Sequence, residues 1–331
     1  MVLAVFGSTD ANPLRVVSYN VENLFHPGRD SVNTDSTYTP EGEKRWSYHR
    51  YNQKTDNIAR VLTNIGEWDG VDVIGLEEVE NAAVVKKLCY TLRPGEYGFV
   101  HYDSPDRRGI DVALVYKKAR IDTIRTKAIG VKPTPNNVLR TSTGPSIEQS
   151  SSPIKGGEQE FITRDILYVC AQVDKRDTLH FFVCHLPSQR GGAAESEWKR
   201  VAAKRVLQEA VDEVLAADKK AKIIVMGDMN SAPKEDIRGL KNRMLEHGQS
   251  PTGRQDYRKG THKHRGQWSC LDQFYVSEAV DSIATVRVYD AEWIMEPDEK
   301  HMGLKPKRTY NGFQYQNGYS DHLPIVLECR R

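Results

Sequence analysis

The sequence is short of cysteine and has no Cys-x-x-Cys pair, so a structural zinc site is not expected. Its five cysteines are widely spaced and leave the redox compartment open. No apolar run approaches the roughly 18 residues that span a membrane. Charge of one sign is not in excess either, because 47 Lys and Arg face 45 Asp and Glu. A polyanionic partner is therefore neither required nor excluded, and basic patches must be sought locally.

What is present suits a soluble globular protein with a sizeable core, since 38% of the 331 residues are hydrophobic and 28% are charged. We predict a single, monomeric domain over residues 14–331. Residues 132–160 are rich in Pro, Ser, Thr, Asn and Gly and predict a long loop rather than a domain boundary. Residues 1–13 form an N-terminal extension. They are either the remnant of a signal peptide, which would place the protein in the periplasm or outside the cell, or the frayed end of a cytoplasmic protein.

Short apolar runs alternate with longer amphipathic stretches. Runs rich in Val, Ile, Tyr and Phe predict strands at 14–19, 73–76, 112–116, 166–173, 179–184, 223–226, 271–276 and 325–327. Apolar residues at helical spacing predict helices at 56–67 and 195–217. The polar turn between 166–173 and 179–184 predicts an antiparallel hairpin. This mixture of hairpins and alternating elements indicates an α/β fold with mixed sheets.

Acidic, amide and imidazole side chains stand at the ends of several predicted strands. They are Asn20, Glu22, Glu77, Glu78, His185, Asp228, Asn230, Asp272, Asp321 and His322. Each one alone is more often a turn residue or a cap, but their repetition at strand ends favours a site. Oxygen ligands without thiolates suit Mg²⁺, or Mn²⁺ or Ca²⁺, better than zinc. Such a site fits hydrolysis of a phosphodiester, which needs an activated water and charge neutralisation.

The segments VVSYNVENLF, VIGLEEVE, FVCHLPS, VMGDMNSAP, LDQFYVS and GYSDHLPI occur in this order between residues 15 and 328. Together they resemble the endonuclease/exonuclease/phosphatase superfamily, whose members are DNase I-like. The resemblance implies a four-layered α/β/β/α sandwich: two mixed sheets packed face to face, with helices outside. It also implies a divalent-metal-dependent hydrolase.

The resemblance assigns a role to each matching position. Glu78 and Asp321 resemble the acidic residues at the metal, with Asn20 and Glu22 beside them. Asp228 resembles the residue that positions or deprotonates the attacking water, and Asn230 the amide that supports it. His322 resembles the histidine that contacts the scissile phosphate, and Asp272 the carboxylate that orients it. His185 resembles a second histidine that some members hold with an acidic partner, for which Asp111 is the candidate here.

Substrate contacts are predicted at Arg164, Arg190, Arg265, Trp268 and Arg308, since guanidinium groups bind phosphates and aromatic rings stack on bases. An ordinary solvated loop or a structural salt bridge is an equal alternative at these positions. The motif HLPS at 185–188 replaces the Tyr-containing strand end of AP endonucleases, which weakens a repair role. A nuclease acting on nucleic acid is the leading interpretation. A sphingomyelinase-like phospholipid phosphodiesterase and a phosphatase acting on inositol phosphates or other small phosphoesters remain alternatives.

Overall fold

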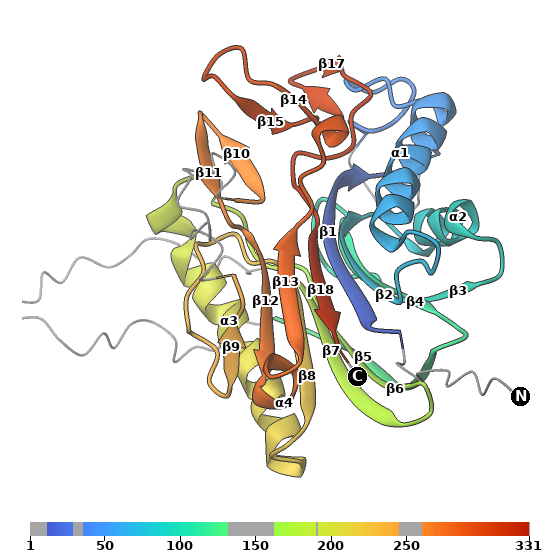
Figure 1. The fold of residues 1–331 in the computed structure, drawn as a ribbon. Coiled ribbons are helices and arrows are strands. Elements are labelled where there is room, and N and C mark those ends of the chain that lie inside the picture. Colours follow the sequence, from blue (N-terminus) through green and yellow to red (C-terminus); the bar gives the residue numbers. More distant parts are fainter. Residues whose placement is uncertain (1–11, 29–35, 132–161, 190, 245–259, 331) are drawn as a thin grey trace, which may run out of the picture.

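Two six-stranded sheets lie face to face at the centre of the molecule (Figure 1). This is a computed structural model, and it describes residues 12–28, 36–131, 162–189, 191–244 and 260–330. The first sheet has the order β13 (Ala284–Val288), β18 (Ile325–Cys329), β1 (Leu14–Leu24), β2 (Val73–Val79), β4 (Asp111–Lys117) and β3 (Tyr97–His101). The second has the order β5 (Ile121–Ile129), β6 (Ile166–Val173), β7 (Asp177–His185), β8 (Lys222–Asp228), β12 (Asp272–Ser277) and β9 (Leu240–Asn242).

Both sheets are mixed. Strands β1 and β2 pair in parallel, as do β7 and β8, and the other pairings within the two sheets are antiparallel. The predicted hairpin is confirmed in β6 and β7, where Asp174 and Lys175 take positive φ angles of 49° and 54° in the turn. Three short two-stranded ribbons extend the C-terminal half: β10 (His262–His264) with β11 (Gln267–Ser269), β14 (Met295–Pro297) with β15 (Leu304–Pro306), and β16 (Tyr310–Asn311) with β17 (Gln314–Tyr315).

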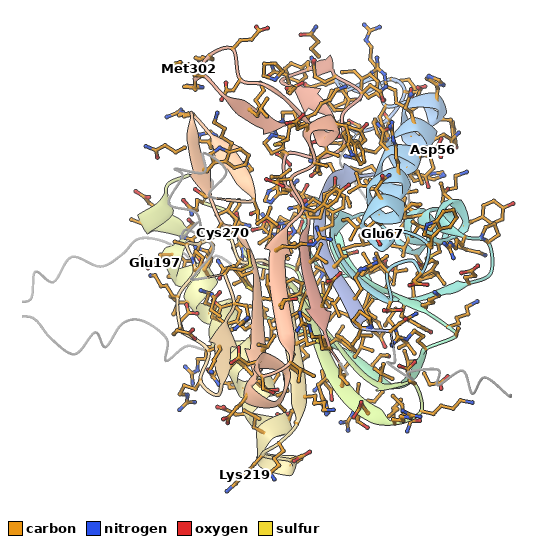
Figure 2. The ribbon with its side chains drawn as sticks, in the orientation of Figure 1. Asp56, Glu67, Glu197, Lys219, Cys270 and Met302 are labelled. Carbon is orange, nitrogen blue, oxygen red and sulfur yellow. The ribbon has the colours of Figure 1, made fainter. Side chains whose placement is uncertain are left out.

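Helices cover the outer face of each sheet. Helices α1 (Tyr48–Gly66) and α2 (Ala82–Leu92) pack on the first sheet, and α3 (Ala193–Ala217) packs on the second. Two small helical turns, α4 (Glu278–Asp281) and η1 (Glu292–Ile294), complete the described elements. Figure 2 marks α1 with Asp56 and Glu67, and marks α3 with Glu197 and the following Lys219, on opposite sides of the molecule. The α/β/β/α sandwich is therefore confirmed.

Three apolar layers hold the four structural layers together. In β8, Ile224 and Met226 point between the sheets, while Ile223 and Val225 point toward α3. Successive strand residues face opposite sides, and both sides are covered here. The central strands therefore read as continuous apolar runs rather than as alternating ones. In the described part of the chain, no helix is long and apolar enough to cross a bilayer.

All eight predicted strands and both predicted helices are present, most with boundaries shifted by a few residues, although α1 begins at residue 48 rather than 56. Helix α2, strands β3, β5, β9 and β13 of the two sheets, and the three short ribbons were not predicted. Strand β5 exposes most of its middle, so its apolar signal is weak. Strand β1 also runs further than expected, to Leu24, through Glu22 and Asn23 with φ angles of 51° and 54°. Its register with β2 shifts at that point, which redirects side chains at the end of the sheet.

Candidate active site

The candidate residues gather at one end of the sandwich. The carboxyl ends of the parallel pairs β1–β2 and β7–β8 carry Asn20, Glu78, His185 and Asp228. Antiparallel neighbours begin at the same end, so β12 brings Asp272 opposite Asp228. The turn before β18 adds Asp321 and His322. Tertiary pairing therefore converts six separate segments into one cluster that both sheets share.

Asp228 lies between two imidazole rings. Its Oδ2 is 3.7 Å from Nε2 of His185 and 3.9 Å from Nε2 of His322. It also accepts a hydrogen bond of 3.2 Å from the Asn20 amide, while Oδ1 accepts one of 2.9 Å from the Asn230 backbone N–H. Burial raises the pKa of Asp228 to about 7, with the nearby Asp272 adding to the shift. A carboxyl group with that pKa can take up a proton near neutral pH.

His322 and Asp272 form a buried pair. Nδ1 of His322 lies 2.8 Å from Oδ2 of Asp272, whose side chain is fully buried. Burial alone would lower the pKa of His322, but the Asp272 charge and hydrogen bond outweigh it and raise the pKa well above its usual value. The Ser320 hydroxyl fixes the turn, because it donates to the Asn20 carbonyl and accepts from the His322 N–H. The Nε2 atom is left for a ligand.

His185 differs from His322 in its charge state. Burial, together with the nearby Arg164 and Arg108, lowers its pKa well below the usual value, so the ring is neutral. Its Nε2 lies 3.8 Å from Glu78 Oε1, and its buried Nδ1 has no hydrogen-bond partner. The site thus pairs one protonated and one neutral imidazole.

A second acidic group lies beside this cluster. Arg308 bridges the carboxylates, with Nη2 2.6 Å from Asp321 Oδ2 and Nε 3.5 Å from Glu22 Oε1. Burial and the Asp321 charge raise the pKa of Glu22 to about 7. Lys54, buried on α1, donates to Thr309 Oγ1 and to the Tyr319 carbonyl, both at 2.5 Å. Burial lowers the pKa of Lys54 to about 8.

The donor atoms around Glu22 and Asp321 fit a divalent cation. They are buried carboxylate oxygens that repel one another, and a positive guanidinium already lies between them. Glu78 adds a third carboxylate, whose Oε2 accepts a 2.9 Å hydrogen bond from the Asn23 N–H. The backbone of Glu78 itself has a positive φ of 65°. Hard oxygen donors of this kind suit Mg²⁺, Mn²⁺ or Ca²⁺.

Comparison with known proteins identifies the family. Residues 15–144 and 145–331 match the model of the Endonuclease/Exonuclease/phosphatase family. The chain belongs to this family. Family members hydrolyse phosphoesters and generally depend on a divalent metal. No curated protein matches the chain.

Solved structures show the same fold at low sequence identity. Truncated TDP2 from Caenorhabditis elegans superposes with a TM-score of 0.56 at 15% identity, covering 96% of this chain and 98% of that one. The human Nocturnin catalytic domain with bound sulfate gives 0.55 at 15% identity, covering 96% and 93%. The mannosyl-6-phosphatase of Bacteroides thetaiotaomicron gives 0.54 at 17% identity, covering 95% and 98%.

Two predicted roles differ from the structure: that of Asp111, which followed from the family resemblance, and the phosphate contact of Arg164, for which a structural salt bridge was the alternative. Asp111 does not contact His185; its carboxylate faces His101 and Ser104 instead, because β4 lies at the far side of β2 from β1. Arg164 is buried and holds the framework rather than a ligand. Its guanidinium donates to the His185 carbonyl at 3.0 Å, the Leu186 carbonyl at 3.3 Å and Asp106 at 3.2 Å.

The other predicted substrate residues are scattered. Arg308 lies in the site, but it neutralises Asp321 and Glu22. Arg265 is exposed at the β10–β11 turn, and Trp268 on β11 packs partly against the core beneath the first sheet's helices. Arg190 and the basic residues at 254–259 lie outside the described residues.

Sequence reasoning missed several side chains that lie in or beside this cluster. His262 packs its ring 4.8 Å from that of His322, and burial with the His322 charge lowers its pKa to about 4. Arg108 donates to Asn23 at 2.8 Å and lies near His185. Tyr38 stacks on Phe25 at 4.6 Å between ring centroids. A buried lysine on an amphipathic helix gives no signal in the sequence, and neither does a tyrosine in a polar loop.

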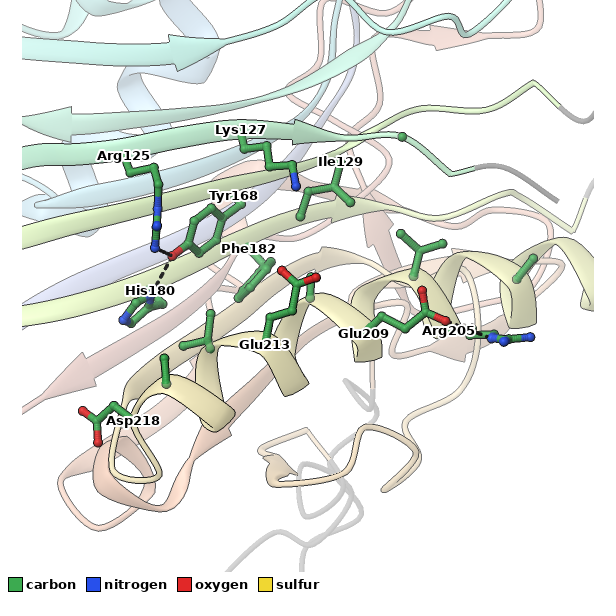
Figure 3. Close-up of a pocket in the computed structure, with 16 residues that line it drawn as sticks. Arg125, Lys127, Ile129, Tyr168, His180, Phe182, Arg205, Glu209, Glu213 and Asp218 are labelled. Carbon is green, nitrogen blue, oxygen red and sulfur yellow. Dashed lines mark hydrogen bonds and ion pairs between the residues drawn. The ribbon is translucent and has the colours of Figure 1, made fainter. Parts of the chain in front are cut away.

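A separate cavity of about 810 Å³ lies between α3 and strands β5, β6 and β7 (Figure 3). There the Tyr168 hydroxyl lies between Arg125 and His180 Nδ1, at 3.3 and 2.8 Å. Glu209 and Glu213 line the helix side. None of the candidate catalytic residues lines this cavity, so it is distinct from the active site.

Proposed function

We propose that the protein is a divalent-metal-dependent phosphodiesterase and that its substrate is a nucleic acid. The observation that carries the proposal is the convergence of two imidazole Nε2 atoms on the Asp228 carboxylate, within 4 Å of one oxygen. One imidazole is protonated and paired with Asp272, while the other is neutral. Hydrolysis of a phosphodiester needs a cationic donor to a phosphate oxygen and, beside it, a group that accepts the proton of the attacking water. This arrangement offers both.

The residues divide the work as follows. Asp228 accepts the proton of the attacking water, and Asn20 and the Asn230 N–H fix the orientation of its carboxylate. His322 donates from Nε2 to a non-bridging phosphate oxygen, while Asp272 stabilises its charged form. Glu78, Asp321 and Glu22, with Asn20 beside them, would hold the cation. When bound, it supplies positive charge to the phosphoryl group.

One partly exposed aromatic residue beside the acidic group, Tyr38, favours a nucleotide-bearing substrate. Burial raises its pKa, and the charges of Glu22 and Glu78 add to the shift. Tyr38 stacks on Phe25 and makes edge contacts with Trp46 and Tyr310 at 6.1 and 6.3 Å. Stacking of a base on an aromatic ring contributes about 1–3 kcal/mol and tolerates any sequence.

The test is a substrate panel with and without EDTA. We expect Mg²⁺- or Mn²⁺-dependent cleavage of plasmid DNA, RNA and bis-p-nitrophenyl phosphate by wild type, and a loss of about 100-fold or more in Asp228→Asn and His322→Ala. His49→Ala and Asp56→Asn, both exposed on α1, are the controls. Full activity in either active-site variant would refute the mechanism. Turnover of sphingomyelin, inositol phosphates or mannose 6-phosphate in place of nucleic acid would overturn the substrate assignment alone.

A further inference from the structure

Three potential ligand side chains meet where β3 ends and β4 begins, outside the candidate active site. They are His101, the last residue of β3, Asp103 in the following loop, and Asp111, the first residue of β4. One ligand atom from each lies within 4.8 Å of the others. In the part of the chain that the structure describes, these three form the one such group of His, Cys, Asp or Glu.

The imidazole of His101 is buried and unsatisfied. Its side chain is 2% exposed, and its Nε2 makes no hydrogen bond although it lies 3.3 Å from Asp111 Oδ2. Leaving a buried ring nitrogen without a hydrogen-bond partner destabilises the folded state. A cation bound to both His101 Nε2 and Asp111 Oδ2 would give this nitrogen a partner.

Asp111 is oriented for such a ligand. The backbone N–H of Ser104 donates to its Oδ1 at 3.1 Å, and the Ser104 hydroxyl donates to the same oxygen. The other oxygen, Oδ2, therefore remains turned toward His101. Metal-binding carboxylates are commonly fixed in this way by hydrogen bonds to the atom that does not bind.

The spacing matches a transition-metal site. For an ion about 2.1 Å from each ligand, two atoms 3.3 Å apart subtend about 100°, between the octahedral and tetrahedral ligand angles. Asp103 now lies 3.9 Å from Nδ1 of His101, the ring nitrogen that does not face Asp111, so its side chain, which is 76% exposed, would turn toward Nε2 to become the third ligand. Water would complete the shell.

We propose that His101, Asp103 and Asp111 bind a divalent transition-metal ion of the Zn²⁺ or Mn²⁺ type, separate from the catalytic cation. A nitrogen ligand with two carboxylates favours these ions over Mg²⁺ and Ca²⁺, which prefer all-oxygen shells. The ion would clamp the β3–β4 loop. That loop carries Asp106, which pairs with Arg164 at 3.2 Å, and Arg108, which reaches Asn23. Both contacts border the active site.

The test counts bound metal in the full chain and does not depend on catalysis. The background is the Glu78→Gln/Asp321→Asn double variant, which lacks two carboxylates assigned to the catalytic cation. After equilibration with Zn²⁺ alone, elemental analysis should find one more metal ion per chain in this variant than in the same variant with His101→Ala added. Competition with a chelator should show at least a tenfold loss of affinity at this site in Asp103→Ala. Because Asp103 is exposed, that variant keeps its fold even if His101→Ala does not. His49→Ala is the matched control.

A second readout is thermal unfolding followed by circular dichroism. Zn²⁺ should raise the Tm of the Glu78→Gln/Asp321→Asn protein, and Asp103→Ala should abolish the rise. Equal metal content with and without His101→Ala, together with equal Tm shifts with and without Asp103→Ala, would overturn the proposal and would identify a simple His101–Asp111 pair. Neither outcome bears on the proposed hydrolysis, because metal content and Tm are measured without turnover.

Discussion

The carboxylate behind His322 gives the sharpest test of the proposed chemistry. Asp272→Asn keeps the size of a fully buried side chain and removes its negative charge. The 2.8 Å contact with Nδ1 would survive as a weaker, neutral hydrogen bond. Asp272 is the largest influence that raises the pKa of His322 against its burial, so the pKa of His322 should fall in the variant.

The size of the effect follows from the bond that is weakened. A buried hydrogen bond to a charged group contributes about 1.5–3 kcal/mol. At about 1.4 kcal/mol per factor of ten, kcat/KM on bis-p-nitrophenyl phosphate should fall about 10- to 150-fold at pH 7. His322 remains protonated across neutral pH in wild type, but it loses its proton at lower pH in the variant. The deficit should therefore be larger at pH 8 than at pH 6.

The assay is a pH profile of kcat/KM for Asp272→Asn beside the surface variant Asp56→Asn, with circular dichroism to confirm folding. The variant's alkaline limb should move to lower pH, while that of Asp56→Asn stays in place. An unchanged profile with unchanged kcat/KM would refute the role assigned to the His322–Asp272 pair. A uniform loss at all pH values would show that Asp272 only positions the ring.

Three further predictions concern buried residues around the site. Burial raises the pKa of Glu77 well above normal and outweighs the Ser18 hydroxyl, whose hydrogen bond to Oε1 at 2.9 Å lowers it, so the carboxyl group is protonated. Glu77→Gln should therefore keep activity and change the free energy of unfolding by less than about 1 kcal/mol, whereas a large loss would show that its charge is needed. Lys54→Met removes a buried counter-charge of Glu22 and Asp321 and should cost about 3 kcal/mol in urea unfolding, with the exposed Lys86→Met as control. A Cβ on Gly227, whose φ is 138°, would lie 1.8 Å from the Cys184 carbonyl oxygen, so Gly227→Ala should lose at least about 3 kcal/mol, while Gly130→Ala should cost little.

Two sequence signals predicted the structure for physical reasons: the apolar runs of the central strands and the polar residues that directly follow them. Parallel central strands such as β8 are covered on both faces, so they appear as unbroken apolar runs that are easily recognised. Polar residues directly after such runs must lie at the carboxyl end of the sheet. Asp228 and His185 were therefore predictable as neighbours even though 43 positions separate them in the printed sequence.

Other features depend on contacts that leave no local pattern. Lys54 looks like a solvent-facing lysine on α1, and only the folding of the 309–319 segment over the helix buries it. Arg164 looked like a phosphate ligand, but the chain turn after β7 occupies its guanidinium with carbonyl groups. Residues far along the chain therefore determine whether an arginine such as Arg164 binds a ligand or stabilises the fold.

By itself the sequence determined an α/β fold with mixed sheets, the positions of the apolar strands and the polar residues at their ends, because periodicity and strand-end polarity are local properties. The four-layered sandwich was expected only from the resemblance to the family. Only the tertiary structure decided which of those residues face each other. It placed both imidazoles on Asp228 and turned Asp111 away from His185 toward His101. The His322–Asp272 pair, by contrast, was already expected from the family resemblance. Strand order across a sheet sets those distances, and no local pattern in the sequence records it.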